Sequence, residues 1–163
     1  MNQLENLPKF QTHNSLVKLL TFSVGKLKLA LPVSKVKKIQ KYSPLHSSGT
    51  SHVSLTHLGD QEVTVVDLHQ KLFKVSQDDL CNDGGYFIIS KSLLRNESPV
   101  SEHLGIRIME SPSLLDAPIE SIRVLPNSYR NADTLEIASH VAVVKSELGV
   151  EQTIFILDLQ CLV

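Results

Sequence analysis

The chain has 163 residues, of which 42% are hydrophobic and 20% are charged, and its formal net charge is −1. This length suits one domain with a sizeable core, and the composition excludes a disordered chain. The near-neutral total gives no general bias towards nucleic acid, but the charges are separated along the chain. Residues 1–50 hold eight lysines and one acid (+7), whereas residues 51–163 hold eight basic and sixteen acidic residues (−8). This separation predicts a basic face and an acidic face that would steer charged partners, with a solvated lysine-rich face as an equal alternative.

The termini and the cysteines indicate the compartment. Residues 1–15 are polar, contain Pro8 and lack the apolar core of a signal peptide, so we expect a flexible N-terminal arm before a single domain at 16–163. No apolar run approaches the roughly 18 residues that a transmembrane helix needs. The two cysteines form neither a CxxC motif nor a disulfide framework. We therefore expect a cytoplasmic protein that does not insert into a membrane.

The first elements read as a hairpin followed by a short turn and a strand. Two β-type runs, 16–24 and 26–31, flank Gly25, which favours a tight turn. Pro32 and Ser34 suit one helical turn, and the residues from Val36 onwards favour a third strand. Residues 43–52 have the composition of a loop.

A second hairpin and a helix follow. Apolar and polar residues alternate over 53–58 and 61–66, on either side of Gly59-Asp60, which predicts two strands and a turn. Residues 68–73 carry helix signals, and the polar, acidic stretch 74–85 reads as a linker.

The second half of the chain repeats this order. "YFIIS" and "HLGIRIM" predict strands, Ser121–Leu125 a short β-type run, and "NSYRNADTLEIAS" a polar loop. The last 24 residues predict a hairpin that ends in a helix-like tail. About ten short strands without long amphipathic helices predict an all-β barrel or sandwich.

One motif occurs twice. Val63–Leu68, "VTVVDL", matches Ile154–Leu159, "IFILDL", which predicts two related half-repeats at about 16–73 and 86–163 and a pseudo-twofold pair of small barrels. An acid at the end of a buried strand can be catalytic. Its duplication instead favours helix N-caps at Asp67 and Asp158, with Gln70 at capping-box spacing from Asp67.

Four segments, in order, resemble the CheW-like domain of bacterial chemotaxis adaptors. "LTFSVGKLKLALPVSKVKKI" resembles the family's opening strands and its "KVxEI" motif, and "HLGDQEVTVVDLHQKLF" resembles "NLRGxVxPVVDLRxxF". "HLGIRIMESPSLLDAPIESI" and the C-terminal "VAVVKSELGVEQTIFILDLQCLV" match two further motifs. The resemblance covers about residues 16–163. It implies two pseudo-symmetric, five-stranded SH3-like β-barrels and a non-catalytic adaptor without a cofactor.

The resemblance also implies partners and contact residues. Family members couple chemoreceptor tips to the regulatory domain of a CheA-type histidine kinase, and other CheW-like domains are further candidate partners. Transferred by motif, the expected partner-binding residues are Val36, Lys38, Ile39, Ser54, His57, Leu58, Gly59 and Asp60. The family's contact arginine falls on Gly59 and its "KVxEI" glutamate falls on Lys38, which indicates a specialised adaptor with a changed partner surface.

Other chemistry has weaker support. His46, His52, His57 and His69 match no common zinc spacing, so no metal site is expected. "KVKKIQK" is basic but has no interleaved aromatic residues for base stacking, so we expect no nucleic acid. A β-barrel that binds a ligand or nucleic acid remains the alternative to the adaptor.

Overall fold

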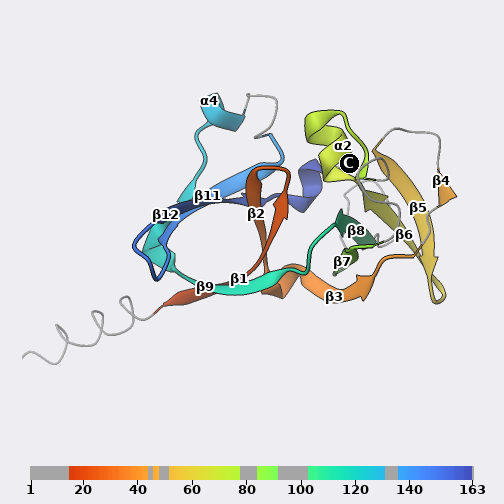
Figure 1. The fold of residues 1–163 in the computed structure, drawn as a ribbon, viewed down its shortest axis with the longest axis horizontal. Helices are drawn as coiled ribbons and strands as arrows, with labels where there is room; N and C mark the ends of the chain where they lie inside the picture. Colours follow the sequence, from red (N-terminus) through yellow and green to blue (C-terminus); the bar gives the residue numbers. More distant parts are fainter. Residues whose placement is uncertain are drawn as a thin grey trace, which may run out of the picture.

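The computed structural model describes residues 15–43, 46–47, 52–77, 84–91, 103–130 and 136–162. Within this part of the chain, strands predominate and form two sheets with a few short helices, as Figure 1 shows. The predicted all-β class is therefore confirmed. The predicted N-terminal arm lies outside the described residues except for Ser15.

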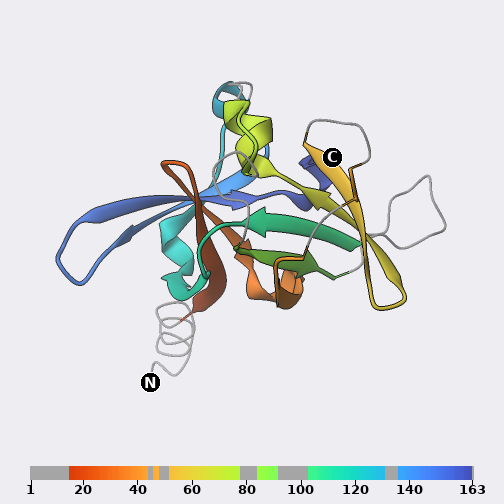
Figure 2. The ribbon, with the colours of Figure 1, turned by 45° about the vertical axis from the view of Figure 1, so that its right-hand side comes forward.

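The strands of the described residues lie in two sheets (Figure 2), each of six strands. The first sheet has the order β10-β11-β12-β2-β1-β9, and the second has the order β3-β7-β8-β6-β5-β4. In chain order the elements are β1 (Leu16–Val24), β2 (Leu27–Pro32), the 3-10 turn η1 (Val33–Lys35), β3 (Val36–Lys41), β4 (His46–Ser47), β5 (Val53–Leu58), β6 (Gln61–Val66), α2 (Leu68–Phe73), β7 (Tyr86–Ser90), β8 (His103–Ile108), β9 (Ser113–Pro118), η2 (Ile119–Ser121), β10 (Ile122–Val124), α4 (Asn127–Arg130), β11 (Ala138–Lys145), β12 (Glu151–Leu157) and η3 (Leu159–Cys161).

The two sheets have the same topology. Each strand of the second sheet has a counterpart in the first. Strands β3, β4, β5 and β6 correspond to β9, β10, β11 and β12, and β7 and β8 correspond to β1 and β2. The corresponding strands have the same neighbours in both sheets. Each sheet also contains one parallel pair, β12 with β2 and β6 with β8. Each therefore joins the first two strands of one half of the chain to the last four strands of the other. The resemblance predicts five strands in each unit, and the sheets have six because the short strands β4 and β10 extend one edge.

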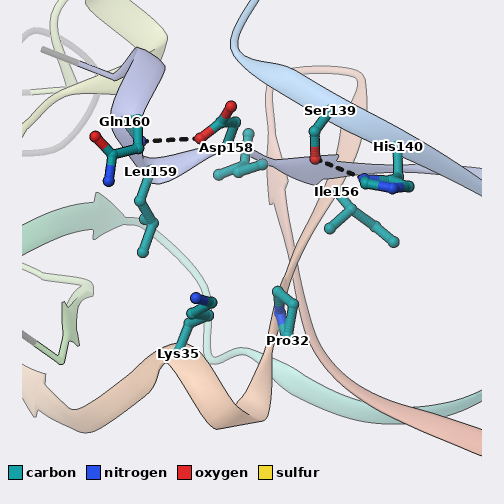
Figure 3. A pocket seen from close by; sticks show the side chains of 9 residues that line it. Pro32, Lys35, Ser139, His140, Ile156, Asp158, Leu159 and Gln160 are labelled. Atoms are coloured by element: carbon teal, nitrogen blue, oxygen red, sulfur yellow. Dashed lines mark hydrogen bonds between the residues drawn. The ribbon is translucent and has the colours of Figure 1, made fainter. Parts of the chain in front are cut away.

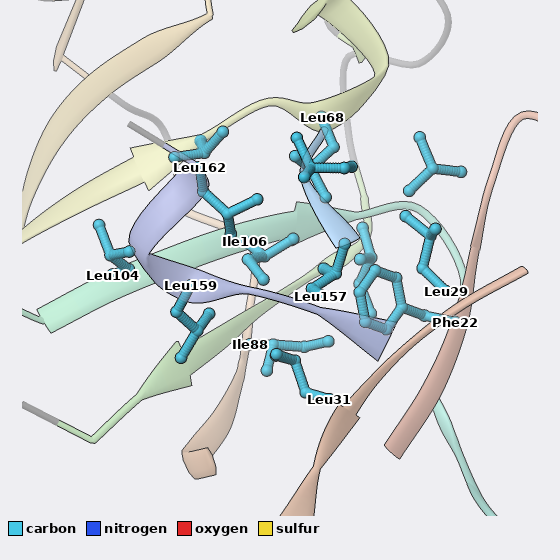
Figure 4. Packing of buried hydrophobic residues seen from close by; sticks show 14 of the residues in the cluster. Phe22, Leu29, Leu31, Leu68, Ile88, Leu104, Ile106, Leu157, Leu159 and Leu162 are labelled. Carbon is cyan, nitrogen blue, oxygen red and sulfur yellow. The ribbon is translucent and has the colours of Figure 1, made fainter. Parts of the chain in front are cut away.

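The largest core cluster lies between the two sheets (Figure 4). Leu29 and Leu31 of β2 reach it from the first sheet, and Ile88 and Ile106 reach it from the second. Smaller clusters lie within each sheet, around Leu19 and Ala30 in the first and around Val63, Val65, Phe87 and Ile89 in the second. Because successive side chains alternate between the faces of a strand, β2 is buried on both faces.

The repeated Asp-Leu step explains part of this core. Leu68 follows Asp67 at the start of α2, and Leu159 follows Asp158 at the start of η3. Both leucines are buried in the cluster between the sheets, and Leu162 joins them (Figure 4). In each half of the chain, the Asp-Leu step thus follows the last strand, β6 or β12, and places a leucine in the core between the sheets.

Three elements differ from the sequence predictions. β9 is not predicted, α4 occupies a stretch predicted as loop, and β4 lies within the predicted loop 43–52. Pro112 precedes β9 and Pro118 is its last residue, which conceals the strand in the sequence, but β9 is an edge strand, where proline is tolerated. β9 pairs with β1, with Leu16 opposite Pro118. These strands are far apart in the sequence, so no local sequence pattern indicates the pairing.

Candidate protein-binding surface

Strand β3 supplies one group of predicted contact residues. It forms an edge of the second sheet and pairs on its inner side with β7. Val36 is half-buried and packs against the core between the sheets, which anchors the strand. Lys38 is exposed, and 44% of the Ile39 surface is accessible, so the strand presents an apolar side chain among lysines.

The β5–β6 hairpin supplies the second group. Leu58 pairs with Gln61 across a two-residue turn, in which Gly59 has a φ of 64°, a left-handed value that glycine adopts without strain. His57 and Glu62 are cross-strand partners, and His57 Nε2 lies 3.8 Å from Glu62 Oε2 with both side chains largely exposed. The turn therefore presents an exposed backbone and polar groups where the family carries an arginine.

The structure brings these two groups together. The register of β3 against β7 shifts between Val36 and Lys38, which leaves Lys37 out of the regular pairing. A bulge of this kind redirects a side chain, and Lys37 Nζ donates a 2.8 Å hydrogen bond to Gln61 Oε1. We call residues 36–41 and 57–62 together the β3–hairpin surface.

Lys37 and Gln61 were missed by sequence reasoning. The only available signal is the basic run itself, because the register shift that directs Lys37 depends on pairing with β7, which is about 50 residues away in the sequence. Of the other predicted contact residues, Ser54 lies towards the opposite end of β5, where it pairs with Val65 and Ser47. The side chain of Leu58 lies outside the described part of the structure.

Charge is unevenly distributed on the β3–hairpin surface. Lys37, Lys38 and Lys41 are exposed along β3, and Asp60 and Glu62 are exposed on the hairpin. A basic strand therefore lies beside an acidic turn. Such an arrangement favours a partner surface with its own complementary pattern of charge over a uniformly charged polymer.

Asp67 makes structural hydrogen bonds outside this surface. It is the N-cap of α2, and its carboxylate accepts hydrogen bonds from the backbone N–H groups of Gln70 (3.0 Å) and Gln77 (2.9 Å) and from the Ser76 hydroxyl (3.3 Å). The Asp67 N–H donates to the carbonyl of His52 at 2.9 Å and not to the Gln70 side chain, so the capping-box part of the prediction is wrong.

Asp158 occupies the equivalent position before η3. It is the N-cap of this 3-10 turn, and its carboxylate accepts a 3.1 Å hydrogen bond from the Gln160 N–H and lies 3.5 Å from the Cys161 thiol, which donates to it. These bonds go to neighbouring backbone and side chains that the two aspartates hold in place, as N-cap residues do.

The histidines serve separate local structures. His57 lies on the hairpin, while the ring of His69 lies tilted against that of Phe73 in α2, with 5.0 Å between the ring centroids. His52 is half-buried beside α2, and its pKa is lowered by burial and by the charges of Lys71 and Lys74, against an opposite effect of Asp67. No group of three His, Cys, Asp or Glu residues converges within the described residues, and the side chain of His46 is not among them. No helix in the same part of the chain is long and apolar enough to cross a membrane.

Two sheets of matched topology around a shared core define the class of protein, a double-unit β-fold with an internal repeat. A family model described as CheW-like domain matches residues 18–163, and the chain therefore belongs to the CheW-like domain family. A solved structure, that of the scaffolding protein TtCheW from Thermoanaerobacter tengcongensis, matches with a TM-score of 0.66 at 16% sequence identity. The match covers 90% of this chain and 87% of that one. A comparison with curated proteins finds no match.

Proposed function

We propose that this protein is a non-catalytic signalling adaptor that couples a receptor or sensor protein to a CheA-type histidine kinase. Membership of the CheW-like family supports a scaffold role in chemotaxis-like signalling. The observation that carries the proposal is the β3–hairpin surface, where two motif-matched segments meet through the Lys37–Gln61 hydrogen bond. The proposed location is the cytoplasm, where such kinases work.

The proposed partner surface differs from that of a standard chemotaxis adaptor. Lys38 reverses the charge of the family's glutamate, and Gly59 removes the side chain of its arginine. Both positions are exposed, so the substitutions alter what a partner meets without disturbing the core. A specialised receptor or kinase, in a pilus-motility or phototaxis system, fits these changes. Other CheW-like domains are further proposed partners.

The proposal predicts that Lys38→Glu changes partner binding and leaves the fold intact. Reversing an exposed charge at an interface acts mainly through long-range electrostatics, and we expect the affinity for the kinase regulatory domain to fall about threefold to tenfold. Size-exclusion chromatography of the mixture, followed by titration calorimetry, measures this change. Lys145→Glu, an exposed lysine at the end of β11 in the first sheet, is the matched control.

Several outcomes would count against the proposal. An unfolded Lys38→Glu protein, judged by far-UV circular dichroism, would make Lys38 structural. Equal losses in Lys38→Glu and Lys145→Glu would place the interaction elsewhere. Standard affinity of the wild-type protein for both an ordinary chemoreceptor tip and an ordinary kinase would remove the argument for a specialised partner.

A further inference from the structure

A pocket of about 340 Å3 lies on the first sheet (Figure 3). It shares no residue with the β3–hairpin surface, although Lys35 of its lining directly precedes Val36. The end of β2 and η1 form one side of it, and β11 and the β12–η3 connection form the other. Figure 3 shows the Lys35 amine on the η1 side and His140 on the β11 side. The lining residues are Pro32, Lys35, Ser139, His140, Ile156, Leu157, Asp158, Leu159 and Gln160.

The internal repeat identifies the counterpart of this pocket in the second sheet. Asp158 and Asp67 follow equivalent strands, so Ile156 corresponds to Val65. Ile156 is in register with Ala30 of β2, and Val65 is in register with Gly105 of β8. Two residues further on, Pro32 therefore corresponds to Arg107.

The antiparallel ladders support the same correspondence. Pro32 lies opposite Leu19 of β1, and Arg107 lies opposite Phe87 of β7. Leu19 and Phe87 are fully buried, each in the cluster within its own sheet. The two sites are thus related by strand register, although β2 ends at Pro32, the N-cap of η1, whereas β8 continues past Arg107 to Ile108.

In the second sheet, the chain itself occupies this site. Gln77 is only 1% exposed, its backbone N–H donates to the Asp67 carboxylate (2.9 Å), and its side-chain Nε2 donates to the Arg107 carbonyl (3.0 Å). The Ser76 hydroxyl adds a third bond to Asp67. Ser76 and Gln77, which follow α2, therefore show how a peptide segment binds between the N-cap aspartate, Asp67, and the end of β8 at Arg107.

We propose that the pocket on the first sheet receives a segment of a partner protein that carries a side-chain amide, held as Gln77 is held in the second sheet. The acceptors are the Asp158 carboxylate for a backbone N–H and the Pro32 carbonyl for the amide. Pro32 is the N-cap of η1, so its carbonyl also serves that turn, and Asp158 accepts from the Gln160 N–H and the Cys161 thiol. A carbonyl oxygen and a carboxylate each accept more than one hydrogen bond, so these bonds are compatible with further donors.

The charge at the pocket indicates which residue should follow the amide-bearing residue in the partner segment. Lys35 is exposed beside it and occupies the place that Glu110 has in the second sheet, and His140 lies across from it. An acidic residue next to the amide complements the charge of Lys35. The chain's own sequence has this character, because Gln77 is followed by Asp78 and Asp79.

A capped hexapeptide with the sequence of residues 74–79, KVSQDD, is the probe. Added to the isotope-labelled chain of 163 residues, it should shift the NMR signals of residues 139–140 and 156–160. The peptide KVSLDD, which lacks the amide, should bind roughly two- to tenfold more weakly, the effect of one lost hydrogen bond. Lys35→Glu should weaken both peptides, and His140→Trp should block both. Gln152→Trp, on an exposed part of β12, should leave binding unchanged.

Other results would overturn the proposal. Absence of shifts at millimolar peptide, equal affinity for the two peptides, or shifts confined to residues 67–77 would show that the pocket does not recognise such a segment. Pocket signals that move with protein concentration alone would assign the site to a second copy of this chain. None of these outcomes bears on kinase binding at the β3–hairpin surface, so the two proposals fail separately.

Discussion

Asp67 and Asp158 end equivalent strands, but their carboxylates make different sets of hydrogen bonds. Asp67 holds the first turn of α2 and also Ser76 and Gln77, whereas Asp158 holds the single turn of η3 and contacts Cys161. Asp67→Ala should therefore lower the free energy of unfolding by about 2–3 kcal/mol, the sum of a lost N-cap and a further lost bond to the linker. Asp158→Ala, the matched comparison, should cost about 1 kcal/mol. Urea denaturation measures both values, and a larger loss for Asp158→Ala would contradict this ranking.

The lowered pKa of His52 makes a pH-dependent contribution to stability. Burial and the nearby Lys71 and Lys74 disfavour the charged imidazole in the folded protein, so the unfolded chain binds the proton more readily. By linkage, the stability that depends on neutral His52 is fully present above the ordinary histidine pKa of about 6.5. It is lost as the pH falls from there through the lower pKa that His52 has in the folded protein. His52→Gln should therefore lose less stability than the wild type between pH 7.5 and pH 5. Urea denaturation across this range checks the difference, and parallel profiles would refute it.

The residues that local pattern could identify are those with local partners. Asp67 is recognisable as an N-cap because its acceptor role depends on residues only three positions ahead. Lys37 and Gln77 were not recognised, since the first depends on a register shift against β7 and the second on a carbonyl 30 residues away.

At the scale of elements, the two tight hairpin turns are built alike and are packed differently. Gly25 in the β1–β2 turn has a φ of 57°, and Gly59 in the β5–β6 turn has a φ of 64°. A Cβ atom at position 25 would lie 2.8 Å from Cε2 of Phe73 in α2, whereas one at position 59 would have no atom within 4 Å. The first turn is thus part of the packing around α2, and the second is open to a partner.

This difference predicts two distinct costs of substitution. Gly59→Ala should cost about 1 kcal/mol, the strain of a left-handed L-residue. Gly25→Ala should cost about 2 kcal/mol or more, because the Phe73 ring must also move. Thermal and urea unfolding of the two variants test the ranking. Equal costs would show that the packing of Phe73 against the turn contributes nothing.

Elements with strong local patterns were predictable with their boundaries. β1, β5, β6 and α2 span the residues that alternation and helix signals indicate. β9 was not predictable, because its flanking prolines argue against a strand and only its pairing with β1 overrides them. α4 follows Pro126, a helix-start signal that the surrounding polar composition obscured.

At the scale of the whole molecule, the two halves of the sequence are not the two sheets. Each sheet combines two strands from one half with four from the other, and the largest core cluster lies between the sheets. The repeat was visible in the sequence because it lies in a short motif. The exchange of strands between the halves was not visible in the sequence. Strands that pair with each other but lie far apart in the chain leave no local sequence pattern. The β3–hairpin surface depends on this exchange, since β3 is held in place by β7 from the other half.

Amide hydrogen exchange of the complex with the kinase regulatory domain tests the central claim most directly, namely that the partner binds the β3–hairpin surface. The account predicts slower exchange over residues 36–41 and 57–62 in the complex than in the free protein. It predicts no change at the β11–β12 turn, residues 146–150, which is exposed on the first sheet. Protection confined to the first sheet, with β3 and the β5–β6 turn unchanged, would contradict the account.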